Sequence, residues 1–328
     1  MPRTQSRISR LVASFLRIVL VPTILFGVPL WPFLGLLCAV PFVGIITIPL
    51  FLLLSLALRF RRMGYCVVVP DISYFPAARM RASVIDLRLV LRWVGESCAR
   101  YGGDPSRIHL MGHGLSAHLA LLTLAQEAVV LSPSSGEVTF PSAAISSSPT
   151  NAQQHAVGRE QSLANAEASI PNGLRRVEIY SPDVAIPPIA GLILVSGVSD
   201  VIKGFRNESD RGIEHLSVLR RACGPSHTAC LLHSPAHLIY AAKNIVDASL
   251  FPPKILLIHG GKDSVVDVSQ STLLKTLLVG CGVGSVRLRA YKQLGHAEAI
   301  AAMFLGMGKA ATRYQKQLLN DIADFVQQ

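Results

Sequence analysis

The first pattern along the chain is an apolar block that is too long for an ordinary buried helix. From Ile18 to Leu58 no side chain is charged, and this run is well beyond the ~20 residues with which a helix crosses a bilayer. No small-residue cleavage site follows a short apolar core, so the block does not resemble a secretory signal. The pattern favours attachment to a membrane.

Arginines flank this block on both sides, which favours a cytoplasmic location for both of its ends and hence a hairpin of two spans. Five prolines interrupt the block and leave a kinked or re-entrant path open, and Phe42 to Ile48 would also suit a buried core strand. We predict that residues 1–58 anchor the chain in an endomembrane, with membrane lipids as partners, and that residues 59–328 form a domain facing the cytoplasm. The arginines are Arg3, Arg7, Arg10, Arg17, Arg59, Arg61 and Arg62, and the prolines are Pro22, Pro29, Pro32, Pro41 and Pro49.

Past the block, short aliphatic runs alternate with longer segments of helical periodicity. The runs are rich in Val, Ile and Leu, as expected for strands buried on both faces. Strands separated by helices predict a parallel, doubly wound α/β sheet. The expected strands are Tyr65–Pro70, Arg107–Met111, Ala190–Val195, Lys254–Ile258 and Ser285–Tyr291, and the expected helices include Ala82–Cys98, Ala117–Ala128 and Lys309–Val326.

The helix expected over residues 82–98 has an amphipathic pattern. Ile85, Leu89 and Trp93 recur every four residues and predict its buried face, whereas Arg88 falls elsewhere on the surface. Later, residues 131–172 are rich in Ser, Ala, Pro and Gln and have little periodic apolar content. We expect these residues to form a flexible insertion in the domain.

Composition narrows the classes of function. With 328 residues and 35.3 kDa, the chain is long enough for one sizeable core, and the apolar block explains its high mean hydropathy of +0.43. A net charge of +11 suits anionic lipid headgroups beside that block. Aromatic residues make up only 6% and do not interleave with a basic patch, so we expect no nucleic-acid partner. The six cysteines are scattered, as reduced core cysteines are.

The segment YGGDPSRIHLMGHGLSAHLALLTL, which begins at Tyr101, predicts a strand, a tight turn and a helix that opens on small residues. A turn of this kind can hold a catalytic serine in a strained conformation between close-fitting glycines. Here the turn carries Gly114, which has no side chain, and the nearest hydroxyl belongs to Ser116. The chemistry of the site therefore depends on whether Ser116 can act as the nucleophile.

Two later loops carry the residues that would activate such a nucleophile. After the strand that begins at Lys254 comes HGGKDSVV, in which Asp263 would orient a histidine and stabilise its imidazolium form. After the last predicted strand, GHAE offers His296 as the general base. We therefore predict Ser116, Asp263 and His296 as the catalytic residues, in the chain order nucleophile, acid, histidine.

With these motifs in order, the chain from about Leu56 to its end resembles the α/β-hydrolase branch that contains prenylcysteine methylesterases, kynurenine formamidases and related carboxylesterases. DISYFP at 71–76 resembles that branch's D-Y-R-x-F-P, YGGDPSRIHLMGH resembles its pre-elbow signature, and SGVSD at 196–200 resembles the segment after its next strand. The resemblance implies an α/β-hydrolase fold and serine-hydrolase chemistry on a carboxylic ester. It also implies a small-molecule or lipidated ester as substrate and no cofactor.

The chain departs from this family at two places. The family reads GHSAGAHLA where this chain reads GHGLSAHLA, so an ungapped alignment puts Gly114 at the nucleophile's place. Two residues of helix rotate a side chain by about 200°, which would point Ser116 away from His296 unless Gly114–His118 forms a shifted elbow. The family's HGG loop, which supplies oxyanion donors, is also absent, and Ile45–Leu50 stand in its place. The alternative function is a catalytically silent fold that binds a ligand or scaffolds a partner at the membrane.

Other polar residues carry less chemistry. His113 and His118 flank the turn and are expected to serve as packing or capping residues. The remaining cysteine and histidine cluster has no spacing typical of zinc ligands, so we expect no metal site. Its members are Cys223, His227, Cys230, His233 and His237.

Overall fold

The computed structural model describes residues 56–132, 177–224, 226–304 and 309–328. The chain divides into two units, Met1–Ser55 and Leu56–Gln328, and the second contains every element discussed below. The predicted membrane anchor and the predicted insertion at 131–172 lie almost wholly outside the described residues. Within the described ranges, no helix combines the length and apolar character needed to span a bilayer.

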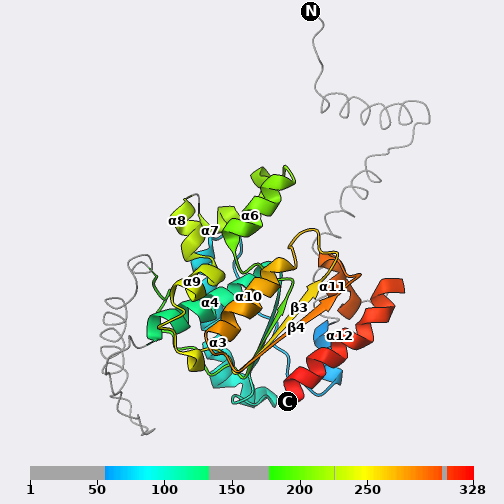
Figure 1. Ribbon diagram of the computed structural model, residues 1–328. Coiled ribbons are helices and arrows are strands. Elements are labelled where there is room, and N and C mark those ends of the chain that lie inside the picture. The colour runs from blue at the N-terminus through cyan, green and yellow to red at the C-terminus, as the bar shows by residue number, and fades with distance from the viewer. Residues whose placement is uncertain (1–55, 133–176, 225, 305–308) are drawn as a thin grey trace, which may run out of the picture. The chain divides into compact units, whose positions relative to one another are not determined.

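A parallel sheet forms the centre of the described part of the chain (Figure 1). It has four strands there, in the order β1-β2-β3-β4, and every neighbouring pair is parallel. The parallel α/β sheet that the sequence predicts is therefore confirmed, together with four of its five strands. The strands are β1 (His109–His113), β2 (Gly191–Val195), β3 (Lys254–Gly260) and β4 (Ser285–Tyr291).

The prediction of a strand over Tyr65–Pro70 is wrong. This segment has no regular secondary structure, and its valines Val67, Val68 and Val69 are 37–49% exposed. A β-branched run becomes a strand only when a neighbouring backbone pairs with it. None of the described strands pairs with this segment, and β1 is the edge strand of the described sheet.

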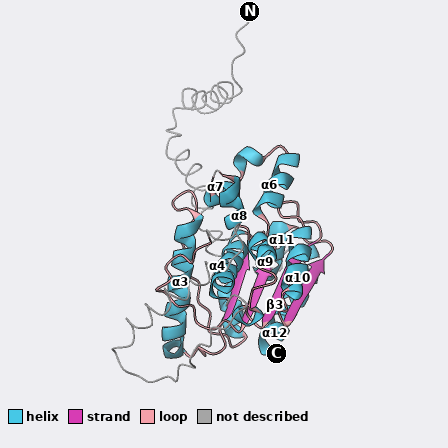
Figure 2. Cartoon of the chain, turned by 60° about the vertical axis from the view of Figure 1, so that its left-hand side comes forward, coloured by secondary structure: helices cyan, strands magenta, loops and turns pink. Residues whose placement is uncertain are grey.

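Helices cover both faces of the sheet (Figure 2). The helices predicted at 82–98, 117–128 and 309–326 are confirmed as α3, α4 and α12, with boundaries that differ by a few residues. The described helices include α3 (Met80–Ser97), α4 (Leu115–Leu131), α6 (Val201–Asp210), α7 (Val218–Cys223), α8 (His227–Leu232), α9 (Pro235–Ala241), α10 (Ser269–Gly280), α11 (His296–Phe304) and α12 (Lys309–Gln327). Short 3-10 helices are η1 (Cys98–Tyr101), η2 (Glu214–Leu216) and η3 (Ala248–Leu250).

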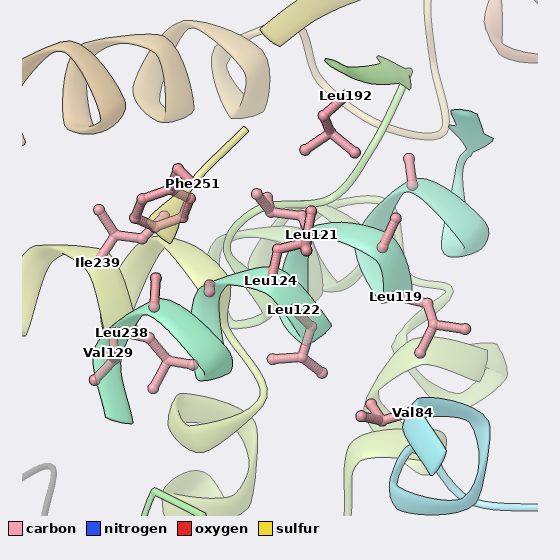
Figure 3. Packing of buried hydrophobic residues seen from close by; sticks show 14 of the residues in the cluster. Val84, Leu119, Leu121, Leu122, Leu124, Val129, Leu192, Leu238, Ile239 and Phe251 are labelled. Carbon is pink, nitrogen blue, oxygen red and sulfur yellow. The ribbon is translucent and has the colours of Figure 1, made fainter. Parts of the chain in front are cut away.

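Alternate residues of the central strands face two separate cores, because side chains on a strand alternate between its two sides. The larger core packs one side of β2 and β3 against α3, α4, α9 and α10, as Figure 3 shows for part of it. The smaller core packs the other side against α11 and α12. Strand residues of the larger core are Leu192, Leu194, Ile255 and Leu257, and those of the smaller core are Ile193, Val195, Leu256 and Ile258.

The prediction of the buried face of α3 is wrong at two of its three positions, whereas Ile85 is partly buried and packs against the larger core. Leu89 and Trp93 are 41% and 45% exposed, although their spacing fits a core-facing stripe. The helix carries a second apolar stripe, and periodicity alone does not choose between the two. The residues that α3 actually buries include Met80, Val84, Leu87 and Leu91, each at most 3% exposed.

Arg88 is also misplaced by the sequence prediction, because it lies in the interior and not on the surface. Its side chain is fully buried, and its Nη1 donates to Glu127 Oε2 of α4 at 2.5 Å. Its Nη2 donates to Val184 O at 2.5 Å and its Nε to Ser181 O at 3.3 Å. A buried charge is tolerated only when it is paired and hydrogen-bonded. The guanidinium thus ties α3 to α4 and to the segment that precedes β2.

We expect Arg88→Ala to lower the free energy of unfolding by about 3–5 kcal/mol, because it removes a fully buried guanidinium together with its ion pair to Glu127 and its hydrogen bonds to Val184 O and Ser181 O. Arg92→Ala on the same helix is the matched control, since Arg92 is exposed and should cost no more than about 0.5 kcal/mol. Urea denaturation of both variants measures the difference. Equal losses for the two variants would contradict the role of Arg88 as a tie between elements.

Candidate active site

The turn that follows β1 has the strained geometry expected for a nucleophile. Gly114 has φ 55° and ψ −116° and directly precedes α4, and its amide donates to Val195 O of β2 at 2.9 Å. A Cβ atom on Gly112 would come within 2.6 Å of Ala117 N, so only glycine allows the strand to approach the helix this closely. The predicted strand, turn and helix are all present.

The loop after β3, residues 261–266, carries Asp263 and is the acid loop of this site. Hydrogen bonds join it to the loop after β4. The amide of Gly261 donates to Tyr291 O, and that of Lys262 to Leu294 O, both at 2.9 Å. Gly260 permits this contact, since a Cβ there would lie 2.2 Å from Leu294 O. The carboxyl ends of β3 and β4 therefore place Asp263 beside the loop that carries the histidine.

Asp263 is oriented by backbone amides and by the histidine. Its Oδ1 accepts hydrogen bonds from the amides of Val265 and Val266 at 2.9 and 2.8 Å, and its Oδ2 lies 2.8 Å from His296 Nδ1. Burial alone would raise the pKa of Asp263, but His296 and the Val266 amide hold that pKa below its usual value. The carboxylate therefore stays ionised and fixes the proton of His296 on Nδ1.

His259, which the sequence analysis did not single out, is buried and contacts the acid loop through Val266 and Asp263. Its Nδ1 lies 2.7 Å from Ser271 Oγ and its Nε2 2.9 Å from Val266 O, and the same Nε2 is 3.6 Å from Asp263 Oδ2. Burial lowers the pKa of His259. Its position as the first residue of HGGKD was the only signal in the sequence.

His296 presents its second nitrogen to the turn at Gly114. A Cβ atom built on Gly114 would lie 3.2 Å from His296 Nε2. His113 packs against the same imidazole, with ring centroids 4.6 Å apart, and its Nε2 lies 3.2 Å from His296 O. The backbone of Gly114 thus stands where a nucleophile's side chain would begin.

Ser116 lies in the first turn of α4, where its Oγ is 3.1 Å from the hydroxyl of Tyr74. No hydrogen bond joins Ser116 to His296 within the described residues. The structure therefore brings Asp263 and His296 together but pairs Ser116 with Tyr74, and its action as nucleophile stays a prediction. The sequence analysis missed Tyr74 as a contact of Ser116, although Tyr74 belongs to the DISYFP motif.

Two hydrogen bonds fix the loop that carries Tyr74 to α3. Ser83 Oγ donates to Ser73 O at 2.6 Å, and the Ser73 amide donates to Asp86 Oδ2 at 2.9 Å. The Tyr74 hydroxyl is therefore presented to Ser116 by an anchored loop. For Ser116 to turn toward His296, it would have to give up this partner.

A pocket of about 720 Å³, the Gly114 pocket, opens beside the turn at Gly114. Gly114, Leu115 and His296 line it, and α6 contributes more lining residues than any other element. Its lining combines apolar side chains with polar and charged ones, which suits a small organic ligand with a polar group. Among the described residues, no group of His, Cys, Asp and Glu is arranged to hold a metal ion. The apolar lining residues are Val198, Val201, Ile202, Phe205, Leu216, Val218, Leu219, Val265 and Val266.

The BD-FAE family model matches residues 53–143, which include β1, the Gly114 turn and α4. The esterase LipQ of Mycobacterium tuberculosis is 36% identical over 64 residues, which cover 20% of this chain and 15% of that protein. A probable isoprenylcysteine alpha-carbonyl methylesterase of Arabidopsis thaliana is 33% identical over 81 residues, which cover 24% of this chain and 17% of that protein. The chain thus matches less than a fifth of the length of either relative.

Solved structures of esterases also align with the chain. Esterase B from Lactobacillus Rhamnosis aligns over 78% of this chain and 65% of its own, with a TM-score of 0.47 and 16% sequence identity. The esterase 2 of Thermogutta terrifontis in its apo form aligns over 76% of this chain and 66% of its own, with a TM-score of 0.43 and 18% identity.

Two buried histidines beside the turn should make stability depend on pH. Burial lowers the pKa of His113 and of His118 to about 4, against about 6.5 in an unfolded chain. The unfolded state then binds more protons between these values, so stability falls as the pH drops from about 6.5 toward 4. Protonation of each histidine should lower the free energy of unfolding by on the order of 3 kcal/mol at pH 4.

His118→Asn isolates one of these contributions, because an Asn amide can still donate to Val198 O, which lies 2.8 Å from His118 Nδ1. We expect this variant to lose on the order of 3 kcal/mol of the destabilisation between pH 7 and pH 4, measured by denaturant titration at pH 7, 5.5 and 4. His227→Asn, at an exposed position, should keep the pH dependence of the wild type. An unchanged pH dependence in His118→Asn would refute the assignment.

Proposed function

We propose that the chain is a member of the α/β-hydrolase superfamily and that it binds a carboxylic ester or a related acyl compound in the Gly114 pocket without forming a serine acyl-enzyme. The names of its matched relatives, an esterase and a methylesterase, support the ligand class. One observation carries the proposal. A Cβ at Gly114 would lie 3.2 Å from His296 Nε2, so the position from which a nucleophile reaches the base holds only a hydrogen atom.

A second candidate function is ester hydrolysis with Ser116 as the nucleophile, His296 as the general base and Asp263 as its orienting acid. The Asp263–His296 pair favours it, as does the hydroxyl of Ser116, the residue that follows Leu115 of the pocket lining. The substrate would be a small-molecule or lipidated carboxylic ester of the kind that a prenylcysteine methylesterase cleaves. This candidate requires Ser116 Oγ to leave Tyr74 and the first turn of α4 to rearrange.

The proposed function includes attachment to a membrane through residues 1–58. The uncharged run from Ile18 to Leu58 and the arginines that flank it support insertion of residues 1–58 into an endomembrane. The hydrolase domain of residues 59–328 would then face the cytoplasm.

A fluorophosphonate probe tests for acylation-competent serine chemistry. We expect no labelling of the purified full-length protein above a heat-killed control, because no hydroxyl is placed to attack. We expect Gly114→Ser to gain labelling, because its Cβ would lie 3.2 Å from His296 Nε2 and would carry the new hydroxyl beside the base. Labelling of the wild type that disappears in Ser116→Ala would overturn the proposal and establish the second candidate.

Carbonate extraction of the full-length protein from membranes tests the anchor. A segment that spans the bilayer is held by its apolar surface and not by charge. We therefore expect the protein to stay in the membrane pellet at alkaline pH. A matched variant with Leu36 and Ile46 both replaced by Arg should move to the soluble fraction, because each charge at bilayer depth costs about 2.5–3.5 kcal/mol. Release of the wild type by carbonate would contradict the anchor.

A further inference from the structure

Within the described residues no serine hydroxyl is hydrogen-bonded to His296, and we propose that the Asp263–His296 pair acts as a general base on a water molecule, which attacks the bound ester directly. This inference rests on the proposed function, because it requires an ester in the Gly114 pocket. It adds a reaction that needs no covalent intermediate with the protein. Geometry, charge and the position of α4 support it independently.

The first support is the direction in which His296 points. Its Nδ1 lies 2.8 Å from the ionised carboxylate of Asp263, so the proton of the neutral imidazole resides on Nδ1. The unprotonated Nε2 then faces Gly114, on the lining of the pocket. Glycine leaves the volume of a hydroxymethyl group beside Nε2, which is close to the volume of one water molecule.

The second support is the charge around the imidazole. The titratable groups that face it are His113 from β1, His259 from β3 and Asp263 from the acid loop. Burial lowers the pKa of His113 to about 4 and also lowers the pKa of His259, so both rings are neutral near pH 7. Asp263 is then the charge that faces His296, and it stabilises the imidazolium that forms when a proton is taken up.

The third support is the start of α4 at the same wall of the pocket. Leu115 is the first residue of this 17-residue helix and lines the pocket beside Gly114. The first amides of a helix have no carbonyl partner inside the helix and carry a partial positive charge. An ester carbonyl oxygen placed at Leu115 N–H would therefore be stabilised as it gains negative charge.

The reaction balances with water as its only co-reactant. As the water oxygen bonds to the ester carbonyl carbon, His296 Nε2 takes one water proton and the carbonyl electron pair moves to oxygen. The tetrahedral intermediate then breaks its bond to the alcohol oxygen, and the imidazolium returns the proton to that oxygen. The products are a carboxylic acid and an alcohol, and the imidazole is again neutral.

Hydrolysis of p-nitrophenyl acetate by the full-length protein tests this inference. We expect turnover above the buffer rate that persists after incubation with a fluorophosphonate probe. His296→Ala should lower the rate by about 10²–10⁴-fold or to the buffer rate, and Asp263→Asn should lower it as well. His227→Ala, which replaces an exposed histidine away from the pocket, is the matched control and should keep the wild-type rate.

Two further measurements separate a chemical role of His296 from a structural one. Thermal melting shows that each variant is folded. Free imidazole should restore part of the rate of His296→Ala beyond its own catalysis in solution, because it can replace the missing base. Absence of rescue in a folded variant would assign His296 a structural role and overturn the inference.

The remaining outcomes distinguish the two proposals. Folded wild type that shows no turnover, or turnover that survives in folded His296→Ala, overturns the water mechanism and leaves the ligand-binding function standing. Turnover that the fluorophosphonate abolishes overturns both, since it requires a nucleophilic serine. Turnover that resists the probe and requires His296 supports both.

Discussion

The contact between the Asp263–His296 pair and the backbone of Gly114 is the constraint on which every functional conclusion depends. Parallel strands end at one edge of the sheet, so the loops after β1, β3 and β4 meet there. Hydrogen bonds between the acid loop and the histidine loop then fix the imidazole, with one nitrogen on Asp263 and the other toward Gly114. The base is thus in place whether or not a nucleophile accompanies it.

The turn at Gly114 keeps the shape of a nucleophile elbow although it has no nucleophile. Its positive φ, its bond to Val195 O and the close approach of Gly112 to Ala117 are all present. These features hold α4 against the sheet, so packing alone is enough to retain them. Glycine at position 114 keeps this turn and its packing, and it leaves space beside an oriented imidazole.

The sequence predicted what depends on local pattern and missed what depends on distant partners. The aliphatic runs of β2 and β3 lie between neighbouring strands of the described sheet, and the chain order of Asp263 and His296 was sufficient to pair them. The run at Tyr65–Pro70 has the same composition but finds no strand to pair with among the described residues. Arg88 can be buried because Glu127 and Val184 O, which lie far along the chain, accept hydrogen bonds from its guanidinium. Tyr74 and Ser116 are 42 positions apart in the sequence, so a local pattern of apolar and polar residues does not predict their contact.

A crystal structure of the Gly114→Ser variant tests the central claim most directly, because it measures where the elbow points. The account predicts that the introduced Oγ lies within about 3.2 Å of His296 Nε2, while Ser116 Oγ keeps its hydrogen bond to Tyr74. An introduced hydroxyl turned away from His296, or a Ser116 Oγ bonded to that imidazole, would contradict the account.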